Sequence, residues 1–343
     1  MNILFDFQHP VDVNFFKNTI NTLKNDNHNI FLAFRPRGSL ERILRYELPG
    51  FPVFSFGKHG KNIVSKLCFN LLREKELLKF YKDNKIELTC GFGPLTTISS
   101  KVFGIPSLAF EDDYEYKINF YYAKLFATRH IMPKIFPANG KNVHFFNGFK
   151  ELAYLHPNYY KPDPGALEEY GLAPDEYVFV REVANISLNY QNKKNNIFEL
   201  IEMIKSLGLK TVLSLEDKSL KNKLEKDCII LKEPVKDINS ILAFAKMAIT
   251  SGDTMAREAS LLGTYTIYTG NREMLIHEDF YKIGIMFNEI SREEIIGRVK
   301  SVLEDKNDKQ AMKDKIDSMI INKWDDMTKV ILKHINDFTG NKK

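Results

Sequence analysis

The sequence predicts an α/β protein with two doubly wound parallel-sheet domains that face each other across a cleft. Short apolar runs of strand length alternate with longer stretches of helical periodicity, before and after a segment rich in glycine and proline. The chain has 343 residues, which exceeds the roughly 250 to 300 residues at which a single core stops growing. A late Ser-Gly turn between a strand and a helix is a third sign of this architecture.

In the first half, apolar runs and helical patterns follow each other without a long interruption. Such alternation is typical of a parallel sheet covered by helices on both faces, so we expect a Rossmann-like domain over residues 1–150. The expected strands cover residues 3–7, 30–34, 51–56, 88–92 and 107–110, and the expected helices cover 15–25, 39–46, 64–83 and 95–103.

Residues 139–164 break this rhythm with two glycines and three prolines, which predicts a domain junction. A second Rossmann-like domain is expected over residues 165–322, and residues 323–343 are expected to form a C-terminal helix that returns to the first domain. The expected strands are 177–183, 211–214, 229–231, 246–249 and 265–268, and the expected helices are 197–207, 218–226, 238–246, 292–303 and 309–338.

Composition excludes several classes of protein. Hydrophobic residues make up 44% and charged residues 27%, which is typical of a globular chain. The net charge of +5 is small against 49 basic and 44 acidic residues, and no basic block requires nucleic acid as a partner. Cys68, Cys90 and Cys228 lie far apart, so neither a disulfide framework nor a zinc site is indicated.

No basic-then-apolar leader and no apolar stretch of about 18 residues is found, so we expect a cytoplasmic protein without a transmembrane span. Residues 69–79 combine leucines with basic side chains in an amphipathic pattern. This stretch could contact a membrane surface as a peripheral site, or it could be a solvated helix packed on the sheet.

The turn at Ser251-Gly252 carries the clearest functional signal. It follows a short apolar strand and opens a helix, so the first amides of that helix are free to face a phosphate. Glu258 lies about one and a half turns into the helix, where a carboxylate can accept hydrogen bonds from ribose hydroxyls. The alternative is a surface helix on which Glu258 is solvated beside Arg257.

These motifs resemble those of the GT-B glycosyltransferase superfamily, and in particular the transferases that form lipid II. The likeness covers Gly104-Ile105-Pro106 with the following Glu111, the segment from Asn119 to Thr128, and Ser251-Gly252 with Glu258. The resemblance implies that Glu258 holds the ribose of a uridine nucleotide. It also places His9, in Phe7-Gln8-His9-Pro10, near the reacting centre, although this loop lacks the two glycines of those enzymes.

Over its full length the chain is similar to the family known as domain of unknown function three-five-four, through His9-Pro10, the segment Glu151 to Tyr159, and Thr254-Met255 with Glu258. A second resemblance is to the non-hydrolysing UDP-N-acetylglucosamine 2-epimerases, which have the same fold. Their His-Arg-Arg-Glu-Asn run corresponds here to residues 180–185, which contain no histidine. The proton-transfer groups of the epimerases are therefore only partly present.

The residues expected in the site divide into three groups. His9 is the candidate base, with Asp6 or Glu111 orienting it, and Glu111 is a second catalytic candidate. Glu115 and Asn119 are four apart and are expected to share a helical face toward acceptor or sugar. The candidates for nucleotide-sugar binding are Arg181, Ser251, Gly252, Asp253, Thr254, Glu258 and Arg272.

Neither a metal nor another cofactor is implied, because the consecutive acids 111–113 diverge in direction at a strand end. The resemblance to the GT-B enzymes implies a glycosyltransferase that takes a UDP-linked N-acetylhexosamine and acts on a surface-glycan or lipid-linked acceptor. Two alternatives stay open at this stage. One is a UDP-N-acetylglucosamine 2-epimerase-like enzyme, and the other is a protein that binds sugar nucleotides without catalysis. The sequence leaves the oligomeric state open.

Overall fold

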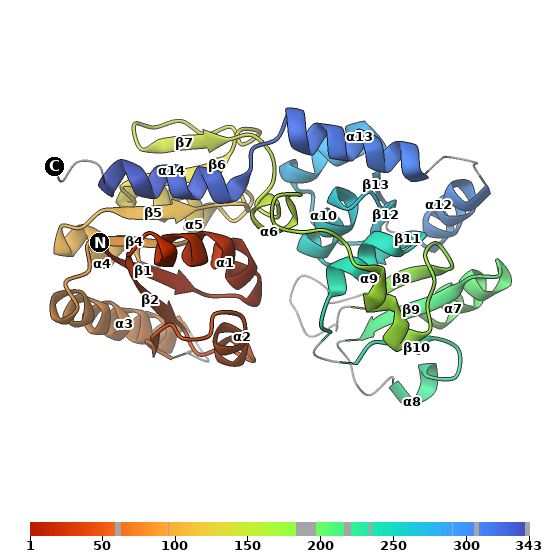
Figure 1. The fold of residues 1–343 in the computed structure, drawn as a ribbon, viewed down its shortest axis with the longest axis horizontal. Helices are drawn as coiled ribbons and strands as arrows, with labels where there is room; N and C mark the ends of the chain where they lie inside the picture. The colour runs from red at the N-terminus through yellow and green to blue at the C-terminus, as the bar shows by residue number, and fades with distance from the viewer. Residues whose placement is uncertain are drawn as a thin grey trace. The chain divides into compact units, whose positions relative to one another are not determined.

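The structure is a computed structural model of the 343 residues, and it describes residues 1–58, 63–94, 96–182, 197–215, 221–232, 235–289, 291–304 and 309–339. The chain forms two compact units (Figure 1). Unit 1 comprises Met1–Tyr159 with Lys323–Lys343, and unit 2 comprises Tyr160–Asn322. The cleft expected between the two domains stays a prediction.

Unit 1 is built on a seven-stranded parallel sheet with the order β3-β2-β1-β4-β5-β6-β7. Its strands are β1 (Asn2–Phe7), β2 (Asn29–Phe34), β3 (Val53–Ser55), β4 (Leu88–Phe92), β5 (Ser107–Phe110), β6 (Arg129–Pro133) and β7 (Val143–Phe146). Its helices are α1 (Pro10–Asn25), α2 (Leu40–Glu47), α3 (Ile63–Asp83), α4 (Thr97–Phe103), α5 (Lys117–Phe126), α6 (Leu152–Leu155) and α14 (Met327–Thr339).

The central strands of unit 1 are buried on both faces and mostly apolar, as expected for a sheet covered on both sides. Phe15 and Phe16 of α1 meet Phe92 and Phe110 at the ends of β4 and β5 in edge-to-face and tilted contacts with ring centroids 4.6–6.0 Å apart. The last helix, α14, lies against α1 and α6 (Figure 1). This packing fixes the carboxyl ends of the strands that carry the candidate site of unit 1.

Unit 2 is built on a six-stranded parallel sheet with the order β10-β9-β8-β11-β12-β13. Its strands are β8 (Tyr177–Glu182), β9 (Lys210–Leu215), β10 (Ile229–Ile230), β11 (Met247–Thr250), β12 (Thr266–Tyr268) and β13 (Met286–Asn288). Its helices are η1 (Pro164–Tyr170), α7 (Ile197–Ser206), α8 (Lys221–Leu224), α9 (Ile238–Phe244), α10 (Asp253–Leu261), η3 (Leu275–His277), α11 (Glu278–Ile283), α12 (Arg292–Glu304) and α13 (Lys309–Asn322).

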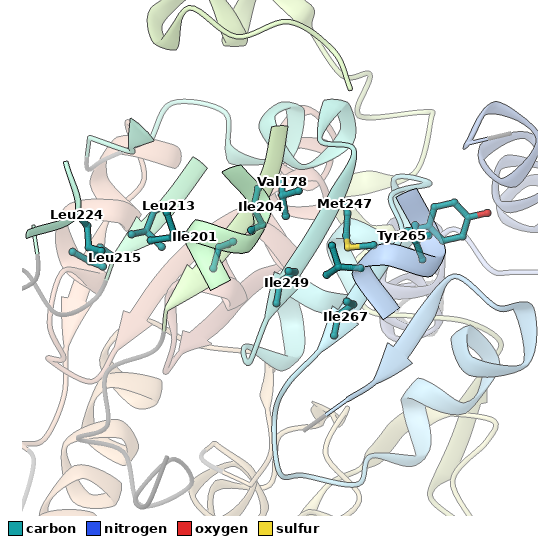
Figure 2. Packing of buried hydrophobic residues seen from close by; sticks show 13 residues of the cluster. Val178, Ile201, Ile204, Leu213, Leu215, Leu224, Met247, Ile249, Tyr265 and Ile267 are labelled. Carbon is teal, nitrogen blue, oxygen red and sulfur yellow. The ribbon is translucent and has the colours of Figure 1, made fainter. Parts of the chain in front are cut away.

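One apolar cluster holds the sheet of unit 2 against its helices (Figure 2). Val178, Ile249 and Ile267 come from three neighbouring strands, and Ile201 and Ile204 come from α7. All five side chains are almost fully buried. Burying each of them contributes roughly 1.5–3 kcal/mol relative to exposure, so the sheet edge above this cluster is a firm support for a site.

The predicted fold class is confirmed, because both units are parallel sheets with helices on them. The expected helix over 309–338 is wrong as one element. It is two helices, α13 and α14, separated by residues 323–326, where Asp325 accepts a hydrogen bond from the Asn147 backbone at 2.7 Å. In the part of the chain that the structure describes, no helix combines the length and apolar character needed to cross a membrane.

Candidate functional site

Each sheet reverses its winding between two central strands. In unit 1 the reversal lies between β1 and β4, and in unit 2 it lies between β8 and β11. Open parallel sheets bind ligands just beyond the carboxyl ends of their strands at such a reversal, because the loops there diverge and leave room. A ligand site is therefore expected at these two edges.

In unit 2 the turn between β11 and α10 presents the start of a helix at the sheet edge. The Gly252 amide donates to Thr250 Oγ1 at 3.0 Å, and Gly252 in extended conformation is the N-cap residue of α10. No side chain among the described residues caps this helix start. The amides of Asp253 and Thr254 thus begin the helix where its dipole favours an anion.

Arg181 lies beside this turn. It is the second-to-last residue of β8 and pairs in register with Thr250 of β11. A Cβ atom built on Gly252 would stand 3.7 Å from Arg181 Cδ and Nε, so the arginine stem passes close to the glycine. Arg181 Nη1 also reaches Ser214 Oγ of β9 at 3.4 Å. A guanidinium and an open helix start therefore occupy the same part of the edge.

Asp253 and Arg272 bind each other in the structure. Arg272 Nη1 lies 2.8 Å from Asp253 Oδ2, and the Tyr268 hydroxyl donates to the other carboxylate oxygen. Gly270 permits this arrangement, because a Cβ at that position would come within 2.1 Å of Tyr268 Oη. The predicted contacts of Asp253 and Arg272 with a nucleotide sugar stay predictions, and this geometry gives both residues a role in holding the turn.

Glu258 and Arg257 are buried, with exposed fractions of 7% and 1%. The alternative of a solvated surface helix is therefore wrong. Arg257 Nη1 approaches His277 Nε2 at 3.5 Å, and the His277 ring meets Tyr268 edge to face at 4.9 Å. Charged side chains are rarely buried without partners. We therefore interpret the buried face of α10 as part of a polar cluster beside the turn. The ribose contact of Glu258 stays a prediction.

In unit 1 the first loop is held by hydrogen bonds to its backbone. The amides of Gln8 and His9 both donate to Asp12 Oδ2, at 2.8 and 2.9 Å, and the Gln8 side chain donates to the Phe92 carbonyl at 2.8 Å. The last bond joins the loops after β1 and β4, which flank the reversal. Burial raises the pKa of Asp12 to about 6.

The His9 ring is exposed and lies beside Arg37. Arg37 Nη1 is 3.1 Å from each ring nitrogen, and a guanidinium only donates hydrogen bonds. The prediction that Asp6 orients His9 is wrong, because both Asp6 oxygens bind Arg73 Nη2 at 2.6 Å in a pair that is almost fully buried.

Glu111 follows β5 and is buried, with 6% of its surface exposed. Its Oε1 accepts a hydrogen bond from the Asp113 amide at 3.3 Å, and its Oε2 has no partner among the described residues. Burial and the neighbouring Asp112 charge raise the pKa of Glu111 to about 8. At neutral pH this carboxyl is mostly protonated, and it can donate a proton or a hydrogen bond.

Asp112 forms a largely buried ion pair with Lys150, with Nζ 2.5 Å from Oδ2. The positive charge of Lys150 also acts on Asp12, so Lys150 lies near acids from the loop after β5 and from the first turn of α1. Sequence reasoning missed Lys150. It stands one residue before the segment Glu151 to Tyr159 on which the family resemblance rests, and this position is the signal that could have identified it.

Glu115 and Asn119 do not share a helical face. Helix α5 begins at Lys117, so Glu115 lies in the preceding loop, where its carbonyl accepts from the Lys117 amide at 3.0 Å. Asn119 Nδ2 lies 3.9 Å from where a Cβ of Gly93 would be, near the end of β4. The helical-face prediction fails because the loop after β5 is longer than expected. Their contact with acceptor or sugar stays a prediction.

Ser251 and Thr254 are half-buried at the unit 2 turn, and their phosphate contacts stay predictions. Within the described ranges, no group of three or more His, Cys, Asp or Glu side chains could hold a metal ion. The polar residues of unit 2 that sequence reasoning missed are Tyr268 and His277. Tyr268 ends a short strand and His277 stands between an apolar run and two acids, and neither lies in a motif that would have singled it out.

Residues 1–338 match the model of a family described as "Protein of unknown function (DUF354)". No curated protein matches the sequence. A UDP-N-acetylglucosamine 2-epimerase from Rickettsia bellii has a similar structure, with a TM-score of 0.71 at 15% identity over 99% of this chain and 97% of that chain.

Two further solved structures show the same likeness. The UDP-N-acetylglucosamine 2-epimerase from Neisseria meningitidis, bound to UDP-N-acetylglucosamine, has a TM-score of 0.69 at 11% identity over 98% of this chain and 100% of that chain. The corresponding values for MurG from Acinetobacter baumannii are 0.63 and 13%, over 98% and 99%. At such identities the likeness concerns the fold, and it confirms the predicted GT-B-like architecture.

Proposed function

We propose that this chain, which belongs to the DUF354 family of proteins of unknown function, is a glycosyltransferase that uses a nucleotide sugar. One observation carries the proposal. The uncapped start of α10 and the side chain of Arg181 lie together at the strand reversal of unit 2, in a GT-B-like fold. A helix start with an adjacent guanidinium is suited to a diphosphate, which has two negative groups.

In this proposal the diphosphate accepts hydrogen bonds from the first amides of α10, with Ser251 and Thr254 as further donors. Arg181 compensates the charge that develops on the leaving diphosphate, as preorganised donors do in other phosphate sites. Glu258 accepts hydrogen bonds from the ribose hydroxyls. Asp253, held by Tyr268 and Arg272, keeps the turn in place.

A UDP-linked N-acetylhexosamine is the proposed donor. Support comes from solved structures of the same fold that are described as containing UDP or UDP-N-acetylglucosamine. The proposed acceptor is a surface-glycan precursor or a lipid-linked saccharide. Cys90 and Cys228 form no disulfide, which supports a reducing compartment, and a cytoplasmic location is part of the proposal.

The proposed transfer breaks the bond between the anomeric carbon and the diphosphate oxygen. The acceptor oxygen forms a new bond to that carbon, the UDP leaves with the bonding electrons, and the hydroxyl proton passes to His9. A neutral imidazole has one ring nitrogen that can accept this proton. Glu111, protonated at neutral pH, supplies a hydrogen bond to the sugar or to the acceptor.

The test uses UDP-N-acetylglucosamine labelled in the sugar, together with polyprenyl-phosphate-linked saccharides as acceptors. Labelled lipid should form with the wild-type chain. His9→Ala should keep UDP affinity and lose turnover by roughly a hundredfold or more, as is typical for removal of a general base. His28→Ala, a half-buried histidine before β2, serves as the matched control and should retain turnover. Unchanged turnover in His9→Ala would contradict the assignment of the base.

A 2-epimerase-like reaction is the second candidate, and one observation favours it. Asp12 and Glu111, at one edge of unit 1, are both buried carboxyls with raised pKa values of about 6 and 8. Epimerisation needs groups that remove and return protons near neutral pH, and such a pair suits that task. A second UDP-sugar formed from UDP-N-acetylglucosamine alone, detected by NMR, would support this candidate. UDP binding without any turnover would instead indicate a non-catalytic binder.

A further inference from the structure

Helix α5 exposes an apolar stripe to solvent. Ile118, Tyr121, Tyr122 and Leu125 have exposed fractions of 64%, 61%, 48% and 64%. Their spacing of i, i+3, i+4 and i+7 places all four on one face of the helix. This face is opposite to the one that carries the buried Phe120 and Ala123. A solvent-facing helical stripe is normally polar, so its composition requires an explanation.

The two helices that carry and adjoin this stripe have lysines and no acidic side chain, and the nearest acids in the sequence lie in the loop before α5. The ten residues of α5 contain no acidic side chain and include Lys117 and Lys124. Lys101 of α4 donates to the Leu125 carbonyl at 3.0 Å, which brings a third lysine to the C-terminal end of the stripe. The seven residues of α4 also lack an acid. We define the α5 surface as the four stripe residues with these three lysines.

We propose that the α5 surface docks on an anionic lipid surface. Aliphatic side chains suit the region just below the headgroups, and tyrosine rings suit the headgroup level, since they are apolar with one polar end. Each lysine near an anionic leaflet adds an electrostatic attraction. The composition of the α5 surface is therefore complementary to lipid in both its apolar and its charged parts.

The size of the α5 surface argues against a second copy of the chain as its occupant. Exposed fractions of about one half to two thirds, applied to side chains of roughly 150–250 Å², give an apolar area on the order of 500 Å². A stable protein interface buries about 800 Å² per partner and is depleted in lysine at its core. Contact of an interfacial helix with a membrane needs no such minimum area, because its strength scales with the apolar area buried and with the attraction to anionic lipids.

The stretch 69–79, where the sequence indicated membrane contact, is less suited. Leu71 and Leu72 on α3 are exposed, but Leu77 is buried, and Arg73 is fully buried in its ion pair with Asp6. This stretch also contains two glutamates, Glu74 and Glu76. This stretch has leucines and basic side chains as the α5 surface does, but acids interrupt its apolar face. It therefore supplies the control for the experiment.

The α5 surface follows directly on the loop that carries Glu111 and Glu115. If the proposed transferase function holds, a docked α5 would bring this loop close to a lipid-linked acceptor. The docking itself is independent of that function, because it depends only on exposed side chains of one helix. Vesicle binding and UDP binding can therefore fail separately.

The test measures sedimentation of the full chain with vesicles of phosphatidylcholine alone, and with vesicles of phosphatidylcholine and phosphatidylglycerol in equal parts. The wild-type chain should bind the mixed vesicles more tightly, and high salt should weaken that binding. The double variant Ile118→Ser and Leu125→Ser should bind at least about tenfold more weakly, because each buried CH₂ contributes a factor of about four. Neither side chain takes part in the buried core.

The matched control is the double variant Leu71→Ser and Leu72→Ser, which removes the same number of exposed aliphatic side chains from α3. It should bind the mixed vesicles as the wild type does, and all variants should keep wild-type UDP affinity. Equal binding of the wild-type chain to both kinds of vesicle would overturn the proposal. So would unchanged vesicle binding in the α5 variant, or self-association of the wild type that the α5 variant abolishes without any vesicle binding.

Discussion

Replacement of Arg181 by methionine tests the diphosphate site most selectively. Methionine keeps an aliphatic stem beside Gly252 and removes the guanidinium that lies at the start of α10. A hydrogen bond to a charged group is worth about 1.5–3 kcal/mol. Because Arg181 is half-buried, water screens part of the attraction between its guanidinium and a phosphate. We therefore expect UDP affinity to fall by roughly tenfold to a hundredfold.

Isothermal titration calorimetry with UDP and with uridine measures this change. The loss should appear for UDP and be absent for uridine, because the proposed contact is with phosphate. Arg298→Met is the matched control. Arg298 lies on α12 in the same unit, and its guanidinium pairs with Glu289 at 2.8 Å. Equal UDP affinity in Arg181→Met and in the wild-type chain would mean that Arg181 does not contact the phosphates, and so would an equal loss of affinity for uridine.

Three further predictions concern stability, and urea denaturation measures each of them. The folded pKa of Glu111, about 8, lies above its ordinary value of 4.5, so the folded state holds a proton that the unfolded state has lost. The free energy of unfolding therefore falls as the pH rises from 4.5 to 8. From pH 6 to 8 it should fall by about 2 kcal/mol more in the wild-type chain than in Glu111→Gln. Gly270→Ala should cost roughly 2–3 kcal/mol, because the new Cβ collides with Tyr268. Arg73→Met should cost about 3–5 kcal/mol, because Asp6 is left as a buried unpaired charge.

Each of these predictions has its own control. An equal pH dependence in wild type and Glu111→Gln would mean that the carboxyl is ionised in the folded state. Gly297→Ala, where a Cβ meets nothing within 4 Å, should change stability by less than about 1 kcal/mol. An unchanged midpoint for Gly270→Ala would show that Tyr268 has another position available. Adding Asp6→Asn to Arg73→Met should restore part of the loss, and a further loss would contradict the ion-pair argument.

Local patterns in the sequence predicted the strands that are apolar throughout and the helices between them. They missed β6 and β7, because Arg129, His130 and His144 interrupt the apolar runs there. His130 is fully buried all the same, with its pKa lowered to about 4 by burial. Tertiary packing decides such strands, and a pattern of single residues carries little information about it.

The candidate site was predictable where it is local in the chain. The Ser251-Gly252 turn, the helix after it and the His9 loop all follow from residues close together in sequence. The partners of those residues did not follow, because the pairs of Asp6 with Arg73 and of Asp112 with Lys150 each join distant segments. The spacing of residues along one chain likewise does not predict the oligomeric state.

The central claim is that the start of α10 binds the diphosphate of a nucleotide. Amide chemical shifts of the ¹⁵N-labelled chain, measured with UDP and with uridine, test it most directly. The amides of residues 253–255 should shift on addition of UDP and stay in place with uridine. Binding of UDP that leaves these three amides unmoved, or no binding of UDP at all, would contradict it.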